Sequence, residues 1–259
     1  MKILLLLALY FNVLQAQLKY VTIGTQVWMT NNLNVATFRN GDAIPEAKTD
    51  EEWRNAGENQ QPAWCYYKND PVNGAKYGKL YNWYAVNDNR GIAPQGWHVS
   101  SYEEWSVLEN YLGGKGHGSV AHTKMKSKSG WRSYMSDGKK YCQNCLNWSD
   151  EYKSKVPCHT CKDKRLLDAP RVTISGNGTN TSGFTAVPGG TRNVDGKFSS
   201  VGEIGEWWTT TVHDPNPEPF GPTSALSCYI GYNATSEVLE SLSIGDNRAK
   251  GYSIRCLRD

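Results

Sequence analysis

Residues 80–86 have the sequence LYNWYAV, and residues 64–67 have the sequence WCYY. These two aromatic stretches lie on either side of two turn signals, Asp70-Pro71 and Asn73-Gly74. Aromatic side chains bury large areas, so stretches of this density predict ring packing inside the protein. The fold is therefore expected to form around short aromatic segments joined by turns.

The whole chain of 259 residues shares this aromatic character, with 10 Trp and 15 Tyr against 5 Phe. Apolar residues make up 39%, which is compatible with a folded core and excludes a disordered or collagen-like chain. Rings with polar tips suit a loop-rich β protein with hydrated aromatic surfaces. The net charge is only +3 and no long run of one sign occurs, so nucleic acid is not an expected partner.

Helical and strand patterns are unevenly distributed along the chain. The clearest helix is predicted for residues 102–112, because Ser100 or Ser101 can cap it and Gly113 ends it. Shorter helices are predicted for residues 50–56 and 119–128, and a β-hairpin for residues 20–29. Strands are predicted for residues 184–187, 206–211, 227–232, 237–243 and 252–257. Helices in the first half and strands in the second predict an α+β protein.

The first sixteen residues have the features of a secretory signal peptide. Lys2 precedes an apolar run at residues 3–11, and Leu14-Gln15-Ala16 supplies a small-residue cleavage site. We expect cleavage after Ala16 and export of residues 17–259. The apolar run is too short for a stable membrane span, so no membrane anchor is expected.

Several blocks of sequence follow one another in a recognisable order. They are Ile23–Met29 with Asn32-Leu33, Ala75–Ala85, Gly96–Val99 leading to Glu104-Trp105, Gly183-Phe184 with Pro188–Gly190, Trp207-Trp208, and Gly251–Cys256. In these blocks the chain resembles the Fibrobacter succinogenes major paralogous domain, a family of exported bacterial proteins common in Bacteroidetes and Fibrobacteres. The resemblance identifies residues 17–259 as one such domain.

The resemblance implies a C-type-lectin-like fold, in which two helices support a twisted antiparallel sheet and long irregular loops. It also implies a location in the periplasm, on the cell surface or outside the cell. The sugar-binding motif of calcium-dependent lectins is missing, because Glu218-Pro219 is followed by Phe220. Calcium-dependent sugar coordination by that motif is therefore not expected.

Residues 134–168 differ from the rest of the chain, because they hold four of the seven Cys and many Lys, and we interpret them as an insertion. Their cysteines, Cys142, Cys145, Cys158 and Cys161, have the spacing C-x2-C-x12-C-x2-C. Two CxxC turns can offer four thiolates to one tetrahedral Zn²⁺, which would order a small insertion that has few apolar residues. The sequence predicts a structural, zinc-knuckle-like site. In an exported protein the same cysteines could instead form two disulfides.

The remaining cysteines and the acidic residues carry weaker signals. Cys65, Cys228 and Cys256 are expected to be buried as small apolar side chains, with a Cys228–Cys256 pair as the alternative. Glu203 and Glu206 flank Gly205 beside two tryptophans, and such residues most often form a turn and a strand edge. His98 is expected to be packed and hydrogen-bonded.

No catalytic motif is present, since the chain has no G-x-S-x-G elbow, phosphate loop or dinucleotide fingerprint. We therefore expect a non-catalytic module that binds carbohydrate or another cell-envelope ligand. Most tryptophans are expected in the core, namely Trp83, Trp97, Trp105, Trp207 and Trp208. Trp131 and Trp148 lie in predicted loops and are candidates for exposed rings that stack on sugars.

Two other functions stay open at this point. The first is a structural or adhesive scaffold for envelope proteins, with the Lys-rich residues 134–168 as its contact surface. The second is a polysaccharide hydrolase, because the carboxylate pair of such an enzyme is spatial and needs no sequence motif.

Overall fold

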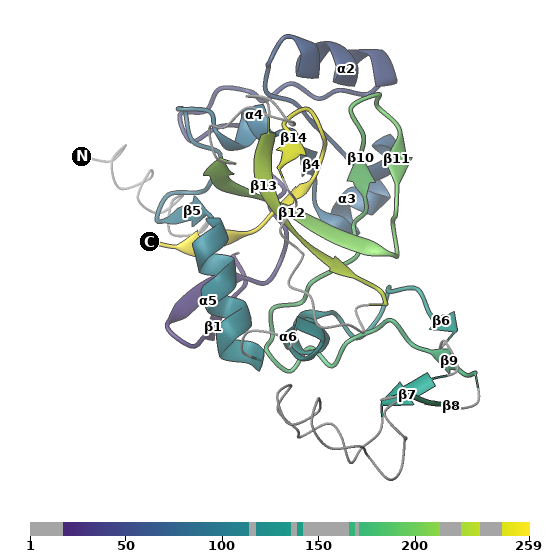
Figure 1. Cartoon of the computed structure of the whole chain (residues 1–259). Coiled ribbons are helices and arrows are strands. Elements are labelled where there is room, and N and C mark those ends of the chain that lie inside the picture. Colours follow the sequence, from purple (N-terminus) through teal and green to yellow (C-terminus); the bar gives the residue numbers. More distant parts are fainter. Residues whose placement is uncertain are drawn as a thin grey trace. The chain divides into compact units, whose positions relative to one another are not determined.

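The computed structural model describes residues 18–113, 118–135, 139–141, 166–168, 171–212, 224–233 and 245–259. These residues belong to two compact units (Figure 1). The main unit comprises the chain up to Trp131 together with Asn177–Asp259, and the smaller unit comprises Arg132–Gly176. The residues interpreted as an insertion, 134–168, lie within the smaller unit. Among the described residues, no helix is both long and apolar enough to cross a membrane.

The described part of the main unit is an α+β structure with two four-stranded sheets (Figure 1). The first sheet has the order β1-β2-β16-β5 and is antiparallel, with β1 at Tyr20–Ile23, β2 at Gln26–Met29, β16 at Cys256–Arg258 and β5 at Trp97–Val99. The second sheet has the order β14-β13-β12-β15, with β14 at Asp246–Asn247, β13 at Ser224–Gly231, β12 at Ile204–Val212 and β15 at Ser253–Ile254. In the second sheet β15 runs parallel to β12 and the other pairs are antiparallel.

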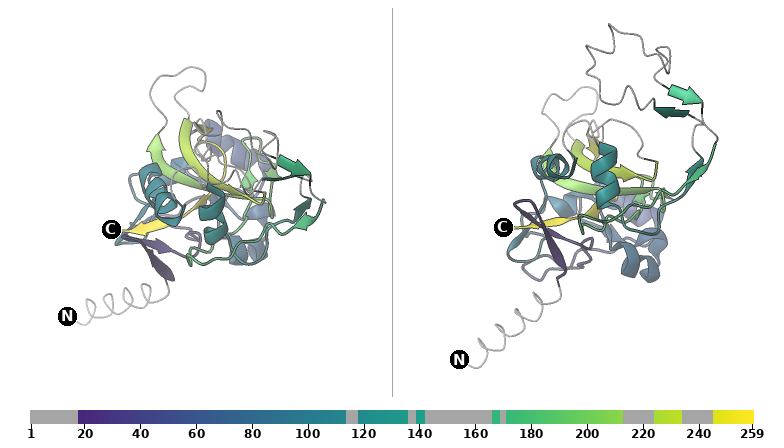
Figure 2. Two further views of the ribbon diagram at one scale, coloured as in Figure 1. Left: turned by 60° about the horizontal axis from the view of Figure 1, so that its bottom comes forward. Right: turned by 90° about the horizontal axis from the view of Figure 1, so that it is seen from below.

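Helices and short strand pairs complete the main unit. The helices are α2 at Asp50–Glu58, α3 at Pro71–Tyr77, α4 at Trp83–Val86, α5 at Tyr102–Gly113 and α6 at Gly118–Met125, with a 3-10 turn at Tyr67–Asn69. The short pairs are β3 at Trp64–Cys65 with β4 at Leu80–Tyr81, and β10 at Thr191–Arg192 with β11 at Phe198–Ser199. Helices α5 and α6 lie side by side next to the β12–β13 pair (Figures 1 and 2).

The smaller unit contains two antiparallel strand pairs among its described residues. Strand β6 at Tyr134–Met135 pairs with β9 at Thr173–Ile174, and β7 at Lys139–Tyr141 pairs with β8 at Leu166–Asp168. The four cysteines of the predicted zinc site lie between β7 and β8, outside the described residues.

Local sequence signals explain the start of the predicted helices. In α5 the Glu104 amide donates to Ser101 Oγ at 3.2 Å, and the Ser101 amide donates to Glu104 Oε2 at 2.7 Å. The same reciprocal capping occurs in α2 between Thr49 and Glu52. Each cap satisfies backbone donors that a helix start leaves without partners. The helices predicted near residues 50–56, 102–112 and 119–128 are therefore confirmed.

The turns predicted at Asp70-Pro71 and Asn73-Gly74 are wrong, because these residues form the start of α3. The Asp70 side chain accepts a hydrogen bond from the Val72 amide at 2.9 Å and caps the helix, while Pro71 occupies its first turn. Proline is as well suited to this helical position as to a turn.

The strand predicted for residues 184–187 is also wrong. Gly183 and Thr185 have φ values of 75° and 57°, which interrupt an extended chain. Only Ala186 pairs there, in an isolated bridge with Lys126. The strands predicted near 206–211 and 227–232 are confirmed as β12 and β13, the one predicted for 252–257 is divided at Arg255 into β15 and β16, and the one predicted for 237–243 lies outside the described residues.

The tryptophans form most of the core, as predicted for Trp83, Trp97, Trp105, Trp207 and Trp208, which are at most 3% exposed. The prediction that Trp131 is exposed is wrong, because it is 4% exposed. Its ring nitrogen donates to Ser127 Oγ at 3.0 Å. Trp148 lies outside the described residues.

The two faces of β12 serve different parts of this core. Trp207 lies on one face, where its ring centroid is 5.5 Å from that of Trp105 on α5. Trp208 lies on the other face, where its ring centroid is 4.4 Å from that of Tyr252. Side chains alternate across a strand, so β12 contributes to both core clusters.

A fully buried arginine joins the two sheets. Arg255 separates β15 from β16, and its Nη1 donates to the carbonyls of Met29 at 2.8 Å and Phe184 at 2.6 Å. Its Nη2 donates to Asn32 Oδ1 at 2.8 Å. Desolvation lowers the pKa of Arg255 to about 9, and carbonyl and amide oxygens replace the water that the guanidinium loses.

Asn32 is the residue on which this network converges. Its Oδ1 accepts from Arg255 and also from Trp207 Nε1 at 2.8 Å. Its Nδ2 donates to the Tyr77 carbonyl at 2.8 Å and to Ser253 Oγ at 3.1 Å. Both the oxygen and the nitrogen of the buried Asn32 amide therefore have hydrogen-bond partners. These hydrogen bonds connect the segment after β2 to α3, β12 and β15.

Replacement of Asn32 by alanine should destabilise the protein by about 3 kcal/mol, because it leaves a buried guanidinium and an indole N–H without their acceptor. The measurement is the free energy of unfolding from urea titration. Asn59→Ala is the matched control, since its exposed side chain bonds only within its own helix end, and it should change stability by less than about 0.5 kcal/mol. Equal effects of the two substitutions would contradict the role assigned to Asn32.

Candidate functional site

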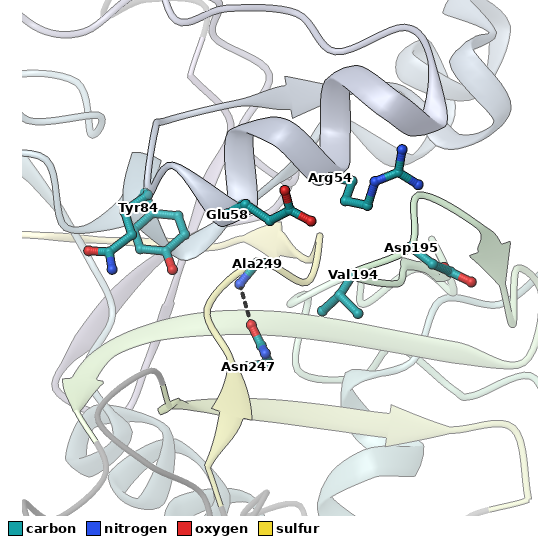
Figure 3. Close-up of a pocket in the computed structure, with 9 residues that line it drawn as sticks. Arg54, Glu58, Tyr84, Val194, Asp195, Asn247 and Ala249 are labelled. Atoms are coloured by element: carbon teal, nitrogen blue, oxygen red, sulfur yellow. Dashed lines mark hydrogen bonds between the residues drawn. The ribbon is translucent and has the colours of Figure 1, made fainter.

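A pocket of about 410 Å³ opens in the main unit (Figure 3). Its walls come from α2 and its C-terminal end, from α4, from the turn between β10 and β11, and from β14 and the turn after it. The lining residues are Arg54, Gly57, Glu58, Gln60, Tyr84, Val194, Asp195, Asn247 and Ala249. In the view of Figure 3, Tyr84 lies at one end and Arg54 and Asp195 lie at the other.

Two contacts hold α2 against the turn after β14. The buried Trp53 donates from its ring nitrogen to the Ala249 carbonyl at 3.0 Å. Gly57 allows the helix to approach closely, because a Cβ atom there would lie 2.6 Å from the Cβ of Ala249. The Ala249 amide in turn donates to Asn247 Oδ1 at 2.9 Å (Figure 3). The floor of the pocket is therefore fixed by packing and by hydrogen bonds.

The pocket offers both hydrogen-bond donors and acceptors. Arg54 and Glu58 are exposed, lie one turn apart on α2, and form no ion pair within the described part of the chain. Asp195 is exposed and accepts a hydrogen bond from the Lys197 amide at 3.0 Å. Tyr84 is half-buried, and burial raises the pKa of its phenol, so it is neutral at physiological pH. This arrangement suits a ligand with several hydroxyl groups.

A second polar cluster lies next to the pocket along β14. Ser227 Oγ is 3.0 Å from Glu206 Oε1 and 2.9 Å from Asp246 Oδ2. Lys250 Nζ is 2.5 Å from Asp246 Oδ1, and the Tyr252 hydroxyl hydrogen-bonds to both carboxyl groups. Asp246 belongs to this cluster and Asn247, the next residue, lines the pocket.

Glu206 retains a proton in this cluster. Desolvation, followed by the charge of Asp246, raises the pKa of Glu206 to about 8, against the smaller opposing effects of Ser227, Lys250 and Tyr252. Two nearby carboxyl groups rarely ionise together, and the one without a cationic partner keeps its proton. Lys250 pairs with Asp246, so the proton belongs to Glu206.

The sequence-predicted site residues have different outcomes. Cys142, Cys145, Cys158 and Cys161 lie outside the described residues. Within those residues, no group of three His, Cys, Asp or Glu could hold a metal ion. Glu203 lies in the turn before β12, as expected. Glu206 takes part in a cluster whose other carboxylate, Asp246, no sequence signal pointed to.

The other three cysteines are buried and unpaired. The alternative of a Cys228–Cys256 pair is therefore wrong, and burial as small apolar side chains is confirmed. Their strands explain this, since Cys228 lies on β13 of one sheet and Cys256 on β16 of the other. Desolvation raises the pKa of Cys65 and of Cys256 to about 12, so both thiols are protonated and unreactive.

His98 is hydrogen-bonded, as predicted, although its side chain is 40% exposed. Its Nδ1 lies 2.8 Å from Asp259 Oδ1, and its Nε2 lies 2.7 Å from Glu104 Oε1. Partial burial opposes the charged form, but the two carboxylates outweigh it and raise the pKa of His98. This residue ties β5 to α5 and to the end of β16.

The sequence model of a family described as the Fibrobacter succinogenes major domain matches residues 21–258. The chain belongs to the Fibrobacter succinogenes major domain family. No curated protein and no solved structure matches the chain. The sequence blocks in which the chain resembles this family include the buried Asn32, Trp207 and Arg255. Most residues of the pocket lie outside those blocks, with Tyr84 as an exception.

Glu206→Gln should make the stability of the protein less dependent on pH. Because the pKa of Glu206 is raised in the folded state, the folded protein is favoured below the ordinary carboxyl pKa and loses stability as pH rises towards about 8. The variant cannot ionise, so its Tm relative to the natural protein should rise by about 4–8 °C between pH 5 and pH 9. Thermal unfolding followed at several pH values measures this.

Glu51→Gln is the control for this experiment, because Glu51 is exposed on α2. Its Tm difference from the natural protein should stay constant over the same pH range. A constant difference for Glu206→Gln as well would show that Glu206 ionises normally.

Proposed function

We propose that this protein is an exported, non-catalytic module that binds carbohydrate, or a cell-envelope ligand with similar hydroxyl-rich chemistry, in the pocket between α2 and β14. The observation that carries this proposal is the composition of the pocket. It combines one aromatic ring with a guanidinium, two carboxylates and two amides in about 410 Å³. Ligand pockets usually have volumes of roughly 300–1,000 Å³, with a few polar groups that set the ligand's orientation.

The side chains of the pocket suit a neutral glycan. Sugar hydroxyls both donate and accept hydrogen bonds, so Arg54 can donate to them while Glu58 and Asp195 accept. The amides of Gln60 and Asn247 can do both. The Tyr84 ring supplies an aromatic surface on which the apolar face of a sugar can stack.

The same pocket gives little support to hydrolysis. Glycoside hydrolysis needs a general acid in a desolvated environment facing a second carboxylate. Glu58 and Asp195 are both exposed. The desolvated carboxyl group of this region belongs to Glu206, which does not line the pocket.

The fold proposal is C-type-lectin-like. It is supported by the two helices α5 and α6 beside the sheets, and by the irregular segments between β2 and α2 and between β9 and β10. Export is supported by the signal-peptide pattern of residues 1–16. Periplasm, cell surface and extracellular space are all compatible with this pattern.

Binding of residues 17–259 to a glycan array and to insoluble polysaccharides tests the proposed function. We expect saturable binding without release of reducing sugar. Arg54→Ala and Glu58→Ala should each weaken binding by roughly 10-fold to 100-fold, because each removes a charged hydrogen-bond partner of the ligand. Glu51→Ala, on the same helix but outside the pocket, should bind normally.

Two results would contradict this assignment. Unchanged binding by both pocket variants would place the ligand elsewhere, and release of reducing sugar would show a hydrolase. If no glycan binds, a scaffold for envelope proteins becomes the better proposal, to be tested by a partner pull-down with and without residues 134–168.

We further propose that Cys142, Cys145, Cys158 and Cys161 hold a structural zinc ion. The support is their spacing, which suits a tetrahedral thiolate site without an open position. Such a site would stabilise the insertion and would not take part in ligand binding.

Thiol titration distinguishes zinc from disulfides. With zinc, the denatured protein in chelator should show seven reactive thiols, the number of cysteines in the chain, and metal analysis should find one zinc ion per chain. With disulfides, only the three buried thiols should react after denaturation and no zinc should be found. In the native protein those three thiols should stay unreactive in both cases.

A further inference from the structure

The contacts of Ser227 favour a proton on one of the two carboxyl groups beside it. Its hydroxyl lies within 3.0 Å of Glu206 Oε1 and 2.9 Å of Asp246 Oδ2, yet a hydroxyl carries one hydrogen and can donate to only one carboxylate. The second contact is favourable only if the carboxyl group itself donates. The Tyr252 hydroxyl also contacts both carboxyl groups, so two hydroxyl hydrogens serve four contacts, and a proton on one carboxyl group adds the donor for a third.

Lys250 decides which carboxyl group carries the proton. Its Nζ lies 2.5 Å from Asp246 Oδ1, which keeps Asp246 ionised. Glu206 then donates to Ser227, and Ser227 donates to Asp246. The donors therefore converge on Asp246, from Glu206 through Ser227 on one side and from Lys250 on the other. The raised pKa of Glu206 agrees with this order.

Strand β14 connects this hydrogen-bonded cluster to the wall of the pocket. Strand β14 consists of only Asp246 and Asn247, and it is the outermost strand of its sheet among the described residues. Asn247 accepts from the Ala249 amide at 2.9 Å through its side chain and from the Lys250 amide at 2.9 Å through its carbonyl. A shift of Asp246 would therefore move both Asn247 and Ala249, which line the pocket.

We propose that Glu206, Ser227, Asp246 and Lys250 form a proton-dependent latch that sets the shape of the ligand pocket. While Glu206 is protonated, the hydrogen-bond chain holds β14 and the turn after it in place. When Glu206 loses its proton, two carboxylates compete for one hydroxyl hydrogen and one lysine, and Asp246 is repelled. Ligand affinity should be high at acidic and neutral pH and should fall in mildly alkaline solution. This regulation rests on the proposed function of the pocket.

Few other charged or titratable groups face Glu206 within the described residues. Tyr252 lies directly before β15, and its hydroxyl hydrogen-bonds to both carboxyl groups and stays neutral, because burial raises its pKa. Tyr229 is opposite Glu206 in the register of β13. Cys228 lies on the opposite face of β13 and also stays neutral, because desolvation raises its pKa. Asp246 and Lys250 are thus the charged side chains that influence the pKa of Glu206.

Hydrogen exchange of the whole protein, residues 17–259, tests the latch without any ligand. The measured quantity is the protection of the peptide covering residues 245–252 between pH 6 and pH 9, corrected for the intrinsic pH dependence of exchange. Because opening releases the Glu206 proton, each pH unit up to the transition at about pH 8 should increase opening of this segment by roughly tenfold, and little protection should remain above it. Glu206→Gln should keep its protection up to pH 9, because the amide still donates to Ser227.

Asp246→Asn gives a second variant in which the carboxylate pair is lost, and its protection should also stop depending on pH. Glu51→Gln is the control and should behave like the natural protein. Constant protection in the natural protein, or the same loss of protection in Glu206→Gln, would overturn the latch.

A binding measurement tests the link to the pocket. With the array glycan that binds most tightly, Kd should rise roughly tenfold for each pH unit above the transition in the natural protein and stay constant in Glu206→Gln. A constant Kd in the natural protein, together with loss of protection, would overturn the link between latch and ligand. If no glycan binds at any pH, the proposed function fails, and the exchange experiment still decides whether the latch exists.

Discussion

The structure depends on the burial of one charged side chain, Arg255, which has no carboxylate partner among the described residues. A guanidinium removed from water must find oxygen atoms for its N–H groups, and here they come from Met29, Phe184 and Asn32. The carbonyl of Met29 is supplied by the end of β2, and that of Phe184 by a segment interrupted by the positive φ values of Gly183 and Thr185. Arg255 itself lies between β15 of one sheet and β16 of the other.

A second buried arginine positions the candidate site, again mainly through backbone carbonyl groups, although Asp50 Oδ1 also lies 3.7 Å from its Nη2. Arg192 donates to the carbonyls of Gly196, Ala47 and Thr49, each at 2.8 Å, and its guanidinium lies 4.8 Å from the ring centroid of Trp53. These contacts connect the β10–β11 turn to the start of α2. The two walls of the pocket that carry Arg54 and Asp195 are thus joined through one side chain. The hydrogen bonds of Arg192 therefore help to hold the walls of the pocket in place.

Sequence reasoning succeeded where the signal was local. The capping serine and glutamate of α5, the hairpin at residues 20–29 and the buried tryptophans all follow from short patterns. It failed at Asp70-Pro71, because this dipeptide is equally compatible with a turn and with the start of a helix. It also failed at Trp131, because this ring is buried by contacts with residues distant in the sequence, such as Ala186. The pocket and the Glu206–Asp246 pair could not be predicted, because their residues meet only through tertiary packing.

The Arg255 network also constrains how the chain can fold. Arg255 and Asn32 are separated by 223 residues, and their hydrogen bonds join the segment after the first hairpin to the last strands. Contacts of such long range form late, because the entropy of closing the intervening loop must be overcome first. Strand β2 can therefore gain its neighbour β16 only after nearly all of the domain has been synthesised. A chain that emerges from the ribosome therefore cannot complete the first sheet until its last residues are available.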